Sequence, residues 1–578
     1  MKNYISKILY ILPKNWIKSI FYISILTLFN AAFELFGIGL VIPFLSAFLG
    51  ETSTVIDNIP FIKNMEKEVL ILFFILIFLI IFIFKNLFFL FFQKIKINFS
   101  YDLAKEVSTK LYLRYLKKNY IFFTLRNTSE LIRNTNAETH LFSFGVMVPI
   151  LTLISDLIIF LTILIFLIFY NPLATLVAAV VMILFGFLMI IFQLSKLKLY
   201  GEIRQEHANS LLKLVTESIG NIKEIILSSN QKFFVNKFLH HNEENAKAGK
   251  KRDFFYILTR PVLEVLTILM FLILVYILIN FGSTSSEIFI ILGVFSFASI
   301  KLVPTIGNIM KGLQGLRYNS VVVDVIYNEM ISKSTDYDLN LNPPISNDKE
   351  PLEFRKIKFT NVSYSYPKSS SNIFEKINLE INKGDKIGFV GQSGSGKTTL
   401  INLFTGLIEP TEGIIEINEK SINEIIKKWQ NSIGYVSQNV YLADESILFN
   451  ITLNKVGDDI DMDRVNHLIE ILDLKSLVSS KKNGLKTPVG EKGIAVSGGQ
   501  MQRLGIARAL YNKPKILILD EATNALDLET QNRVLESIYN EMYNLTVISV
   551  SHDKNSLKHC KKIFSVKKNE LIENNYKD

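Results

Sequence analysis

Long, largely uncharged runs in the N-terminal part of the sequence constrain the fold more than any other feature. Six stretches, near 19–48, 69–92, 141–170, 173–194, 255–280 and 287–311, each reach the length of about 20 helical residues that crosses a bilayer. A bilayer interior offers no water to backbone N–H and C=O groups, so a spanning segment must satisfy them internally. The sequence therefore predicts six transmembrane helices.

Composition agrees with a membrane protein. The 578 residues include 44 Phe and are 49% hydrophobic, and the mean hydropathy is +0.30. The net charge is +10, but the basic residues flank the apolar runs, so we predict no nucleic-acid partner. The single cysteine, Cys560, excludes an intrachain disulfide. The first apolar run lacks a small-residue cleavage site after it, which favours an uncleaved span over a signal peptide.

The segments between the apolar runs predict orientation. Residues 93–140 and 195–253 are rich in Lys and Arg, so by the positive-inside rule they and the N-terminus are cytoplasmic. Their composition is helical, which indicates extensions of the membrane helices with short transverse helices near Phe122–Asn127 and Leu212–Gly220. Residues 1–18 are either an amphipathic helix on the membrane face or merely a basic flank.

A glycine-rich loop follows the strand-like run Lys386–Val390 and precedes the helical pattern Thr399–Phe404. In this context the motif G-x-x-x-x-G-K-[ST] predicts a nucleoside triphosphate site, because its backbone N–H groups form a nest for anionic oxygens. Lys397 would reach the β- and γ-phosphates, and the Thr398 hydroxyl would ligate Mg²⁺. The predicted ATP-binding residues of this loop are Gly391, Gln392, Ser393, Gly394, Ser395, Gly396, Lys397, Thr398 and Thr399.

Two acids follow the later buried-strand pattern Ile516–Leu519. Asp520 is placed to hold Mg²⁺ through water, and Glu521 is placed to polarise an attacking water. Between the loop and these acids, Ser497, Gly498, Gly499 and Gln500 open the helical stretch Met501–Leu510.

These elements together resemble the ATP-binding cassette (ABC) family, whose signature LSGGQ is here Val496–Gln500. The resemblance implies ATP and Mg²⁺ as ligands and Lys397, Gln438, Glu521 and His552 as catalytic residues. It further implies that Thr487–Gly493 is an exporter-specific loop and that Ser497–Gln500 caps the γ-phosphate. The resemblance also implies that Tyr366 stacks on adenine, that Gln438 contacts Mg²⁺ and that His552 contacts the γ-phosphate. The loop Asn524–Asp527 would couple the two nucleotide sites, with Asp527 at the nucleotide.

The resemblance also implies a domain plan: an amphipathic segment at 1–18, a six-helix transmembrane domain at 19–332, a linker at 333–351 and a nucleotide-binding domain at 352–578. The expected fold class is an α-helical polytopic membrane domain of the type I ABC exporter fold joined to an α/β P-loop NTPase domain. Since one chain carries one phosphate loop and one signature, and the signature of one subunit serves the loop of the other, we expect a homodimer.

Two short stretches, Phe33–Leu45 and Lys301–Asn308, resemble flippases of lipid-linked oligosaccharides. The favoured function is ATP-driven flipping of such a lipid across a bacterial inner membrane, and the abundance of Lys, Asn, Ile and Phe hints at an AT-rich bacterial genome. Export of lipid A, phospholipid or drugs and a nucleotide-gated channel remain alternatives. The six spans argue against a soluble cassette ATPase, and the absence of an N-terminal Cys/His domain argues against a protease-coupled peptide exporter.

Ionisable residues within predicted spans are candidates for substrate contact. We expect Lys85 and Arg260 to extend toward the cytoplasmic interface or to lie in the cytosolic extensions. For Lys301 a cavity role and a structural role are equally weighted. The other candidates are Lys311, as a cavity cation, and Glu34, Asp156 and Glu264, which either pair with these cations or bind substrate.

Overall fold

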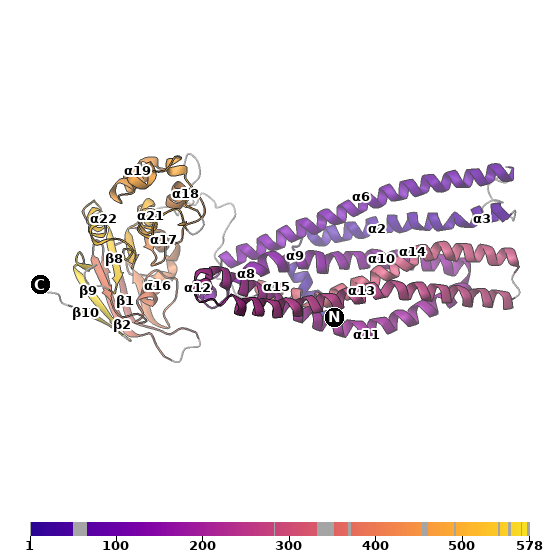
Figure 1. Cartoon of the computed structure of the whole chain (residues 1–578), viewed down its shortest axis with the longest axis horizontal. Coiled ribbons are helices and arrows are strands. Elements are labelled where there is room, and N and C mark those ends of the chain that lie inside the picture. The colour runs from indigo at the N-terminus through magenta and orange to yellow at the C-terminus, as the bar shows by residue number, and fades with distance from the viewer. Residues whose placement is uncertain are drawn as a thin grey trace. The chain divides into compact units, whose positions relative to one another are not determined.

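The computed structural model describes residues 2–49, 66–281, 284–331, 352–367, 371–453, 460–490, 493–541, 544–552, 557–567 and 569–574. The chain divides into two compact units, which are treated separately here (Figure 1). One is helical and comprises residues 1–118 and 122–339, and the other comprises residues 119–121 and 340–578. The predicted linker at 333–351 lies outside the described residues.

Long helices lying side by side form the helical unit (Figure 1). They are α2 (Trp16–Gly39) with its continuation α3 (Val41–Leu49), α6 (Lys67–Leu116), α10 (Val148–Tyr170), α11 (Pro172–Gly220), α13 (Gln231–Asn280) and α14 (Ser285–Tyr318). The shorter helices are α1 (Lys2–Ile11), α7 (Tyr120–Thr124), α8 (Thr128–Arg133), η1 (Asn134–Glu138), α9 (Thr139–Phe142), η2 (Ser143–Met147), α12 (Ile222–Leu227) and α15 (Ser320–Ile331).

The second, fourth, fifth and sixth predicted spans fall within α6, α11, α13 and α14, whereas the first covers α2 and α3 and the third runs from α9 through η2 into α10. In the described part of the chain, five helical segments are long and apolar enough to cross a membrane: Trp16–Leu49, Glu68–Leu116, Thr128–Tyr170, Gln231–Asn280 and Ser285–Tyr318. The predicted fourth span lies in α11, whose apolar stretch among the described residues is Pro172–Val181. The predicted turn between the third and fourth spans is present, because Asn171 leaves helical geometry and accepts a hydrogen bond from the Ala174 N–H at 3.0 Å.

One predicted short helix is in place and the other is displaced. Helix α7 overlaps the predicted Phe122–Asn127 segment. The prediction of a second one at Leu212–Gly220 was wrong, because α11 continues to Gly220 and the separate short helix is α12. The helix continues through the stretch before Gly220, and the break comes at Asn221, which leaves helical geometry with φ −112° and ψ 28° between α11 and α12.

The N-terminal segment forms helix α1, and part of its apolar surface packs on the protein while Ile5, Leu9 and Tyr10 are exposed. Ile8, Ile11 and Leu12 are buried in the helical unit. Lys7 Nζ forms an ion pair with Asp324 of α15 at 2.5 Å. Neither sequence interpretation, a surface-lying helix or a plain basic flank, anticipated that α1 packs against the protein.

The second unit is the mixed α/β domain that the sequence predicts. Its strands are β1 (Lys356–Tyr364), β2 (Phe374–Asn382), β3 (Lys386–Val390), β4 (Glu412–Ile417), β5 (Lys420–Ser421), β6 (Ile433–Val436), β7 (Ile516–Asp520), β8 (Thr546–Ser551), β9 (Lys562–Lys567) and β10 (Glu570–Asn574). Its helices are α16 (Lys397–Phe404), η4 (Ile422–Glu424), α17 (Ile426–Asn431), α18 (Ile447–Thr452), α19 (Met462–Ile471), α20 (Lys475–Ser479), η6 (Gly484–Lys486), α21 (Gly498–Tyr511) and α22 (Leu528–Glu541).

Two sheets organise this unit. One has the order β2-β1-β4-β5 and is antiparallel, and the other has the order β10-β9-β3-β8-β7-β6. In the larger sheet, β9, β3, β8, β7 and β6 run parallel, and β10 pairs antiparallel at the edge. Strands β3, β7 and β8 are buried along their whole length, as their continuous apolar runs require of central strands in a parallel sheet.

Helices α11 and α14 are in close contact at Gly201. A Cβ atom at this position would lie 2.0 Å from the backbone oxygen of Tyr318. We predict that Gly201→Ala lowers the thermal unfolding midpoint of the purified protein in detergent, since forced overpacking costs about 1–3 kcal/mol. Gly249→Ala is the matched control, because no atom lies within 4 Å of its added Cβ and helical Gly→Ala replacements stabilise. Equal midpoints for the two variants would contradict this packing.

Candidate nucleotide site

Four neighbouring parallel strands bring the predicted catalytic residues to one edge of the larger sheet. The phosphate loop follows β3, His552 follows β8, Glu521 follows β7, and Gln438 lies two residues beyond β6. Since parallel strands end at the same edge, residues far apart in sequence meet there. The nearness of these side chains is thus a consequence of strand order.

The phosphate loop has the backbone conformation that its glycines permit. Gly394 and Gly396 have φ values of +79° and +102°, in the left-handed region. A Cβ atom on Gly391 would lie 2.6 Å from the Val566 carbonyl oxygen. The loop borders a cavity of about 780 Å³ whose lining includes Val390–Ser395, His552 and Ser565–Lys567. Side chains at these glycines would distort the turn or collide with β9.

Lys397 and Ser395 are arranged to meet an anionic ligand. Lys397 Nζ donates to the carbonyl oxygens of Gly391 at 2.7 Å and Gln392 at 3.2 Å, so its ammonium group curls over the loop. The buried Ser395 Oγ has no hydrogen-bond partner among the described residues. A cation and a spare hydroxyl beside the start of α16 are suited to phosphate oxygens.

Glu521 lies at the centre of the polar cluster. Its carboxylate accepts hydrogen bonds from Gln438 Nε2 at 2.9 Å and Asn524 Nδ2 at 3.2 Å. His552 Nδ1 lies 3.6 Å and Lys397 Nζ 4.0 Å from its oxygens. The structure therefore brings together the four residues predicted to be catalytic. Asn524 was placed in the coupling loop by sequence, and its bond to Glu521 was not anticipated.

The backbone of Glu521 is strained. Its φ is +49°, which is unfavourable for a residue with a Cβ and costs on the order of 1 kcal/mol or more. The Glu521 N–H donates to the Val550 carbonyl of β8 at 3.0 Å, and this bond helps to hold the conformation. The turn directs the carboxylate toward Gln438 and His552.

Asp520, immediately before it, is buried at the end of β7. Burial raises the pKa of its carboxyl group and the charge of Glu521 adds to this, whereas the hydrogen bond from the Tyr435 hydroxyl at 3.2 Å and the charge of Lys397 oppose it. A bound cation would favour its ionised form.

The donor set fits Mg²⁺, which prefers carboxylate, amide and hydroxyl oxygens. Asp520 supplies a carboxylate and Thr398 a hydroxyl at the first turn of α16. Gln438 uses its amide nitrogen on Glu521, which leaves its amide oxygen for a cation.

Tyr366 lies beside the phosphate loop. Its hydroxyl is 3.3 Å from Thr399 Oγ1, and its ring packs edge-on against Tyr364 with centroids 5.1 Å apart. The ring is half-buried. This position is compatible with adenine stacking.

The signature begins α21 with a capping box. The Ser497 hydroxyl accepts from the Gln500 N–H at 3.3 Å, and the Gln500 side chain accepts from the Ser497 N–H at 2.9 Å. Gly499 is close to the Asn524–Asp527 loop, since a Cβ there would lie 3.2 Å from the Ala525 oxygen. Asp527 caps α22 through the Thr530 N–H at 2.9 Å, and this bond lowers the pKa of its carboxyl group. The signature residues do not line the cavity at the phosphate loop.

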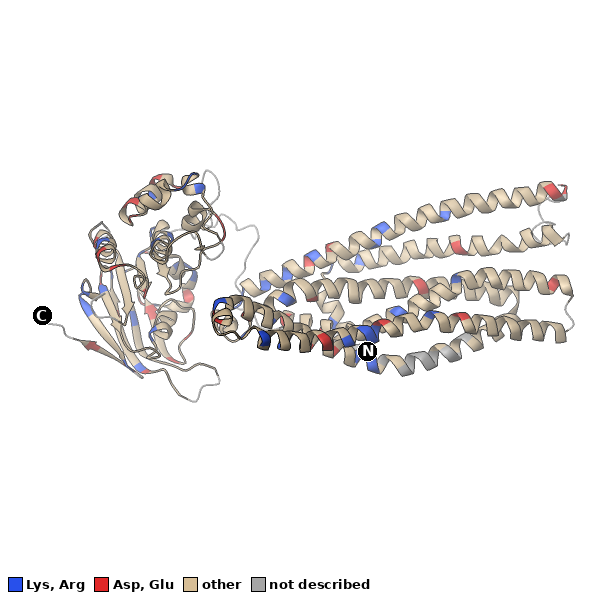
Figure 2. Ribbon diagram, viewed as in Figure 1, with Lys and Arg blue, Asp and Glu red and all other residues tan. Residues whose placement is uncertain are grey.

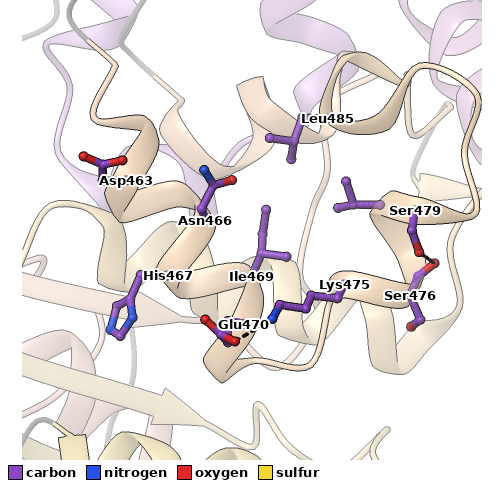
Figure 3. Close-up of a pocket in the computed structure, with 10 residues that line it drawn as sticks. Asp463, Asn466, His467, Ile469, Glu470, Lys475, Ser476, Ser479 and Leu485 are labelled. Atoms are coloured by element: carbon purple, nitrogen blue, oxygen red, sulfur yellow. Dashed lines mark hydrogen bonds and ion pairs between the residues drawn. The ribbon is translucent and has the colours of Figure 1, made fainter.

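Sequence reasoning missed two features of this unit. The β9 residues Ser565, Val566 and Lys567 line the cavity, but they belong to no motif. A second hollow of about 700 Å³ lies among α19, α20 and η6 (Figure 3). Its Lys475 and Glu470 side chains pair with each other at 2.5 Å, and none of the predicted nucleotide-binding residues lines it.

Of the predicted exporter-specific loop, Thr487–Gly490 and Gly493 are described. This loop is joined to the first residue of α18 by the Ile447 N–H to the Thr487 oxygen, and to the segment before α18 by the Val489 N–H to the Glu445 oxygen, both at 3.0 Å.

In the helical unit, Lys85 is not where the sequence placed it. The prediction that it extends to an interface was wrong, because its side chain is 4% exposed and pairs with Glu34 at 2.6 Å. Lys301 Nζ lies 3.2 Å from the other Glu34 oxygen. An acid from α2 thus binds cations from α6 and α14, a partnership across helices that a linear pattern does not show. Arg260, in contrast, is exposed and pairs with Glu264 at 2.9 Å, and Lys311 is exposed.

The fold and site define a P-loop ATPase domain on the same chain as a helical membrane domain. Residues 374–524 match the ABC transporter family, and residues 18–300 match the ABC transporter transmembrane region. The chain therefore belongs to the ABC transporters, which couple ATP hydrolysis to transport.

Similar proteins support this assignment. The leukotoxin export ATP-binding protein LtxB of Aggregatibacter actinomycetemcomitans is 36% identical over 238 residues, 40% of this chain and 33% of that protein. The leukotoxin translocation ATP-binding protein LktB of Mannheimia haemolytica shows the same identity and coverage. The chain thus matches these relatives over about a third of their length. A solved structure of a bacterial Atm1-family ABC exporter with ATP bound aligns with 96% of this chain and 94% of that chain, with a TM-score of 0.79 and 18% identity, which shows the type I ABC exporter fold.

We predict that Tyr366→Leu weakens ATP binding about fivefold to a hundredfold, because stacking of a base on an aromatic ring contributes roughly 1–3 kcal/mol. Tyr366→Phe keeps the ring and loses the bond to Thr399, so it should stay within about threefold of wild type. Competition of ATP against a fluorescent ATP analogue measures both. If the two variants lost affinity equally, the hydroxyl and not the ring would be responsible.

Proposed function

We propose that this chain is a homodimeric exporter that uses ATP to move an amphipathic, lipid-linked substrate with an anionic headgroup across the bacterial inner membrane. A lipid-linked oligosaccharide is the favoured cargo. The observation that carries the ATP-driven part is the convergence of Lys397, Gln438, Glu521 and His552 at one sheet edge.

The chain's own residues suggest how hydrolysis proceeds. Lys397 and the loop N–H groups would hold the β- and γ-phosphates, and Tyr366 would fix the base. Glu521, oriented by Gln438 and Asn524, would accept a hydrogen bond from the attacking water. His552 lies beside the same Glu521 carboxylate and would contact the γ-phosphate. Mg²⁺ bound near Thr398, Gln438 and Asp520 would neutralise phosphate charge.

The separation of the signature from the phosphate loop supports the proposal of a homodimer. In the described residues, Ser497–Gln500 adjoin the Asn524–Asp527 loop and are absent from the lining of the phosphate-loop cavity. A second copy would supply its signature to this cavity. ATP would then join the two domains and hydrolysis would release them, which is a two-state element that a ligand biases.

The proposed cargo rests on charge in the helical unit. Lys85 and Lys301 share the single carboxylate of Glu34, so the group holds two ammonium charges against one acid. An excess positive charge among apolar helices is costly and attracts an anion. The pyrophosphate of a lipid-linked glycan provides one.

Membrane orientation is also part of the proposal. Charged residues are most frequent toward the end of the helical unit that carries α7, α8 and α12. They are sparse along the halves of the long helices that are farther from that end (Figure 2). By the positive-inside rule this end is cytoplasmic, as is the ATPase domain.

Polypeptide export is the second candidate, because LtxB and LktB are named for leukotoxin export and translocation. These relatives match 40% of this chain, which leaves the larger part without a curated counterpart among them. Stimulation of the ATPase by a glycolipid and not by an unfolded polypeptide, both offered in liposomes, would favour the lipid; the reverse result would favour the polypeptide.

Glu521→Gln should retain ATP binding and lose phosphate release by about a hundredfold or more, because the amide cannot act as a base. Bound ATP should then hold the two ATPase domains together, which crosslinking in nanodiscs detects. Glu529→Gln, an exposed α22 acid paired with Arg533, is the control. Full phosphate release from Glu521→Gln would contradict the role of this carboxylate.

Lys301→Gln should lower the ratio of lipid-stimulated to basal ATPase activity in liposomes, and Lys301→Glu should lower it further by placing a second carboxylate beside Glu34. Arg260→Gln is the control, since Arg260 pairs outside this group. Substrates to compare are a lipid-linked oligosaccharide, lipid A and a hydrophobic drug. An unchanged ratio for Lys301→Glu would remove Lys301 from the substrate path.

A further inference from the structure

A polar cavity lies within the helical unit, apart from the Glu34 group and the nucleotide site. It has a volume of about 480 Å³ and is bordered by α2, α6, α10 and α14. Its polar lining includes Asn30, Lys96, Thr152, Asp156 and Asn308. Polar cavities inside a bundle of apolar helices are functional candidates, because polar groups there are costly to bury.

Two side-chain oxygen atoms of residues in this lining accept no hydrogen bond within the described part of the chain. Asn30 Oδ1 and Asp156 Oδ2 are buried and accept no hydrogen bond from any described residue, and the two side chains are 4% and 8% exposed. A buried acceptor without a partner is destabilising, so both positions favour a ligand that brings N–H or O–H donors.

The remaining contacts hold these acceptors in place. Asn308 of α14 lines the same cavity as Asp156 of α10. Thr27 lies one helical turn from Asn30, and Ser155 directly precedes Asp156. The hydroxyl groups of Thr27 and Ser155 are hydrogen-bonded at 3.2 Å and join α2 to α10. The acceptors therefore come from rigid helices that are joined beside the cavity.

The other side of the cavity is cationic and apolar. Lys96 Nζ lies 3.5 Å from Thr152 Oγ1, at the limit of a hydrogen bond, and 5.4 Å from the centre of the Phe92 ring. Phe89, Phe144 and Ile159 complete an apolar wall. Such a lining suits a compact headgroup that combines donors with a short apolar stem.

We propose that this cavity binds the donor-bearing headgroup of an amphipathic ligand, with Asn30 and Asp156 as the acceptors that select it. The shared chemistry is N–H or O–H donation, which either a sugar or an amine headgroup supplies. The site rests on the proposed function, because it gives the cargo's polar end a place in the helical unit. Asn30 and Glu34 are four residues apart on α2, so the cavity and the cationic Glu34 group are one helical turn apart on that helix.

Binding of three labelled amphiphiles to the full chain in nucleotide-free nanodiscs tests the site, with empty nanodiscs subtracted to remove partitioning. Octyl glucoside carries a sugar, octylammonium carries an amine, and octyl sulfate carries no donor. Asn30→Leu and Asp156→Asn are the test variants. Glu264→Gln is the matched control, because that acid belongs to an exposed pair on α13.

We expect saturable binding of at least one donor-bearing probe, weakened about tenfold by Asn30→Leu and by Asp156→Asn and unchanged by Glu264→Gln. Octyl sulfate should not be weakened by either test variant. Loss of glucoside binding identifies a sugar headgroup, and loss of octylammonium binding identifies an amine. If Asp156→Asn does not fold, Asn30→Leu decides alone.

Donor-bearing probes that bind both test variants as tightly as wild type, or that show no saturable binding to wild type, would overturn the site. The assay uses no ATP, and binding should persist in Glu521→Gln. Failure of this site is therefore distinguishable from failure of the ATPase proposal.

Discussion

The parallel pairing of β6, β7, β8 and β3 is the constraint on which the nucleotide site depends. Each strand ends at the same sheet edge, so hydrogen bonds between the strand backbones place Gln438, Glu521, His552 and the phosphate loop together. The buried apolar side chains of these strands stabilise the arrangement. Because the sheet already places the strand ends together, short loops after these strands are sufficient to form the site.

Around Glu521 the site keeps a backbone conformation and a charge arrangement that are locally unfavourable in energy. The residue has an unfavourable φ, and its carboxylate is 13% exposed beside a buried aspartate. Bonds from Gln438 and Asn524 and the nearby ammonium of Lys397 offset the repulsion between the two acids. Since these partners come from separate elements, a change in any one of them alters the position of the carboxylate, which is the property expected of a site coupled to movement.

The helical unit presents the opposite problem, because its polar groups lie among apolar helices. Glu34 joins α2 to α6 and α14 through two lysines, and the Asn30–Asp156 cavity lies among the same helices with α10. Buried charges contribute little net stability, so the stability of the bundle does not explain their presence. Both groups present chemistry that an amphipathic headgroup could satisfy, cationic at Glu34 and acceptor-rich at Asn30 and Asp156.

Local sequence patterns are sufficient to predict the elements and the chemistry of their motifs. Apolar runs of membrane length, the strand before the phosphate loop and the strand before Asp520 are local patterns, and local patterns report helices, strands and motif identity. Tertiary structure decided which groups meet. Contacts between helices distant in sequence decide the pairing of Lys85 with Glu34, the packing of α1 on the protein and the cavity at Asn30. Periodicity identifies which face of a helix is apolar, but only packing decides what that face and its buried polar residues touch.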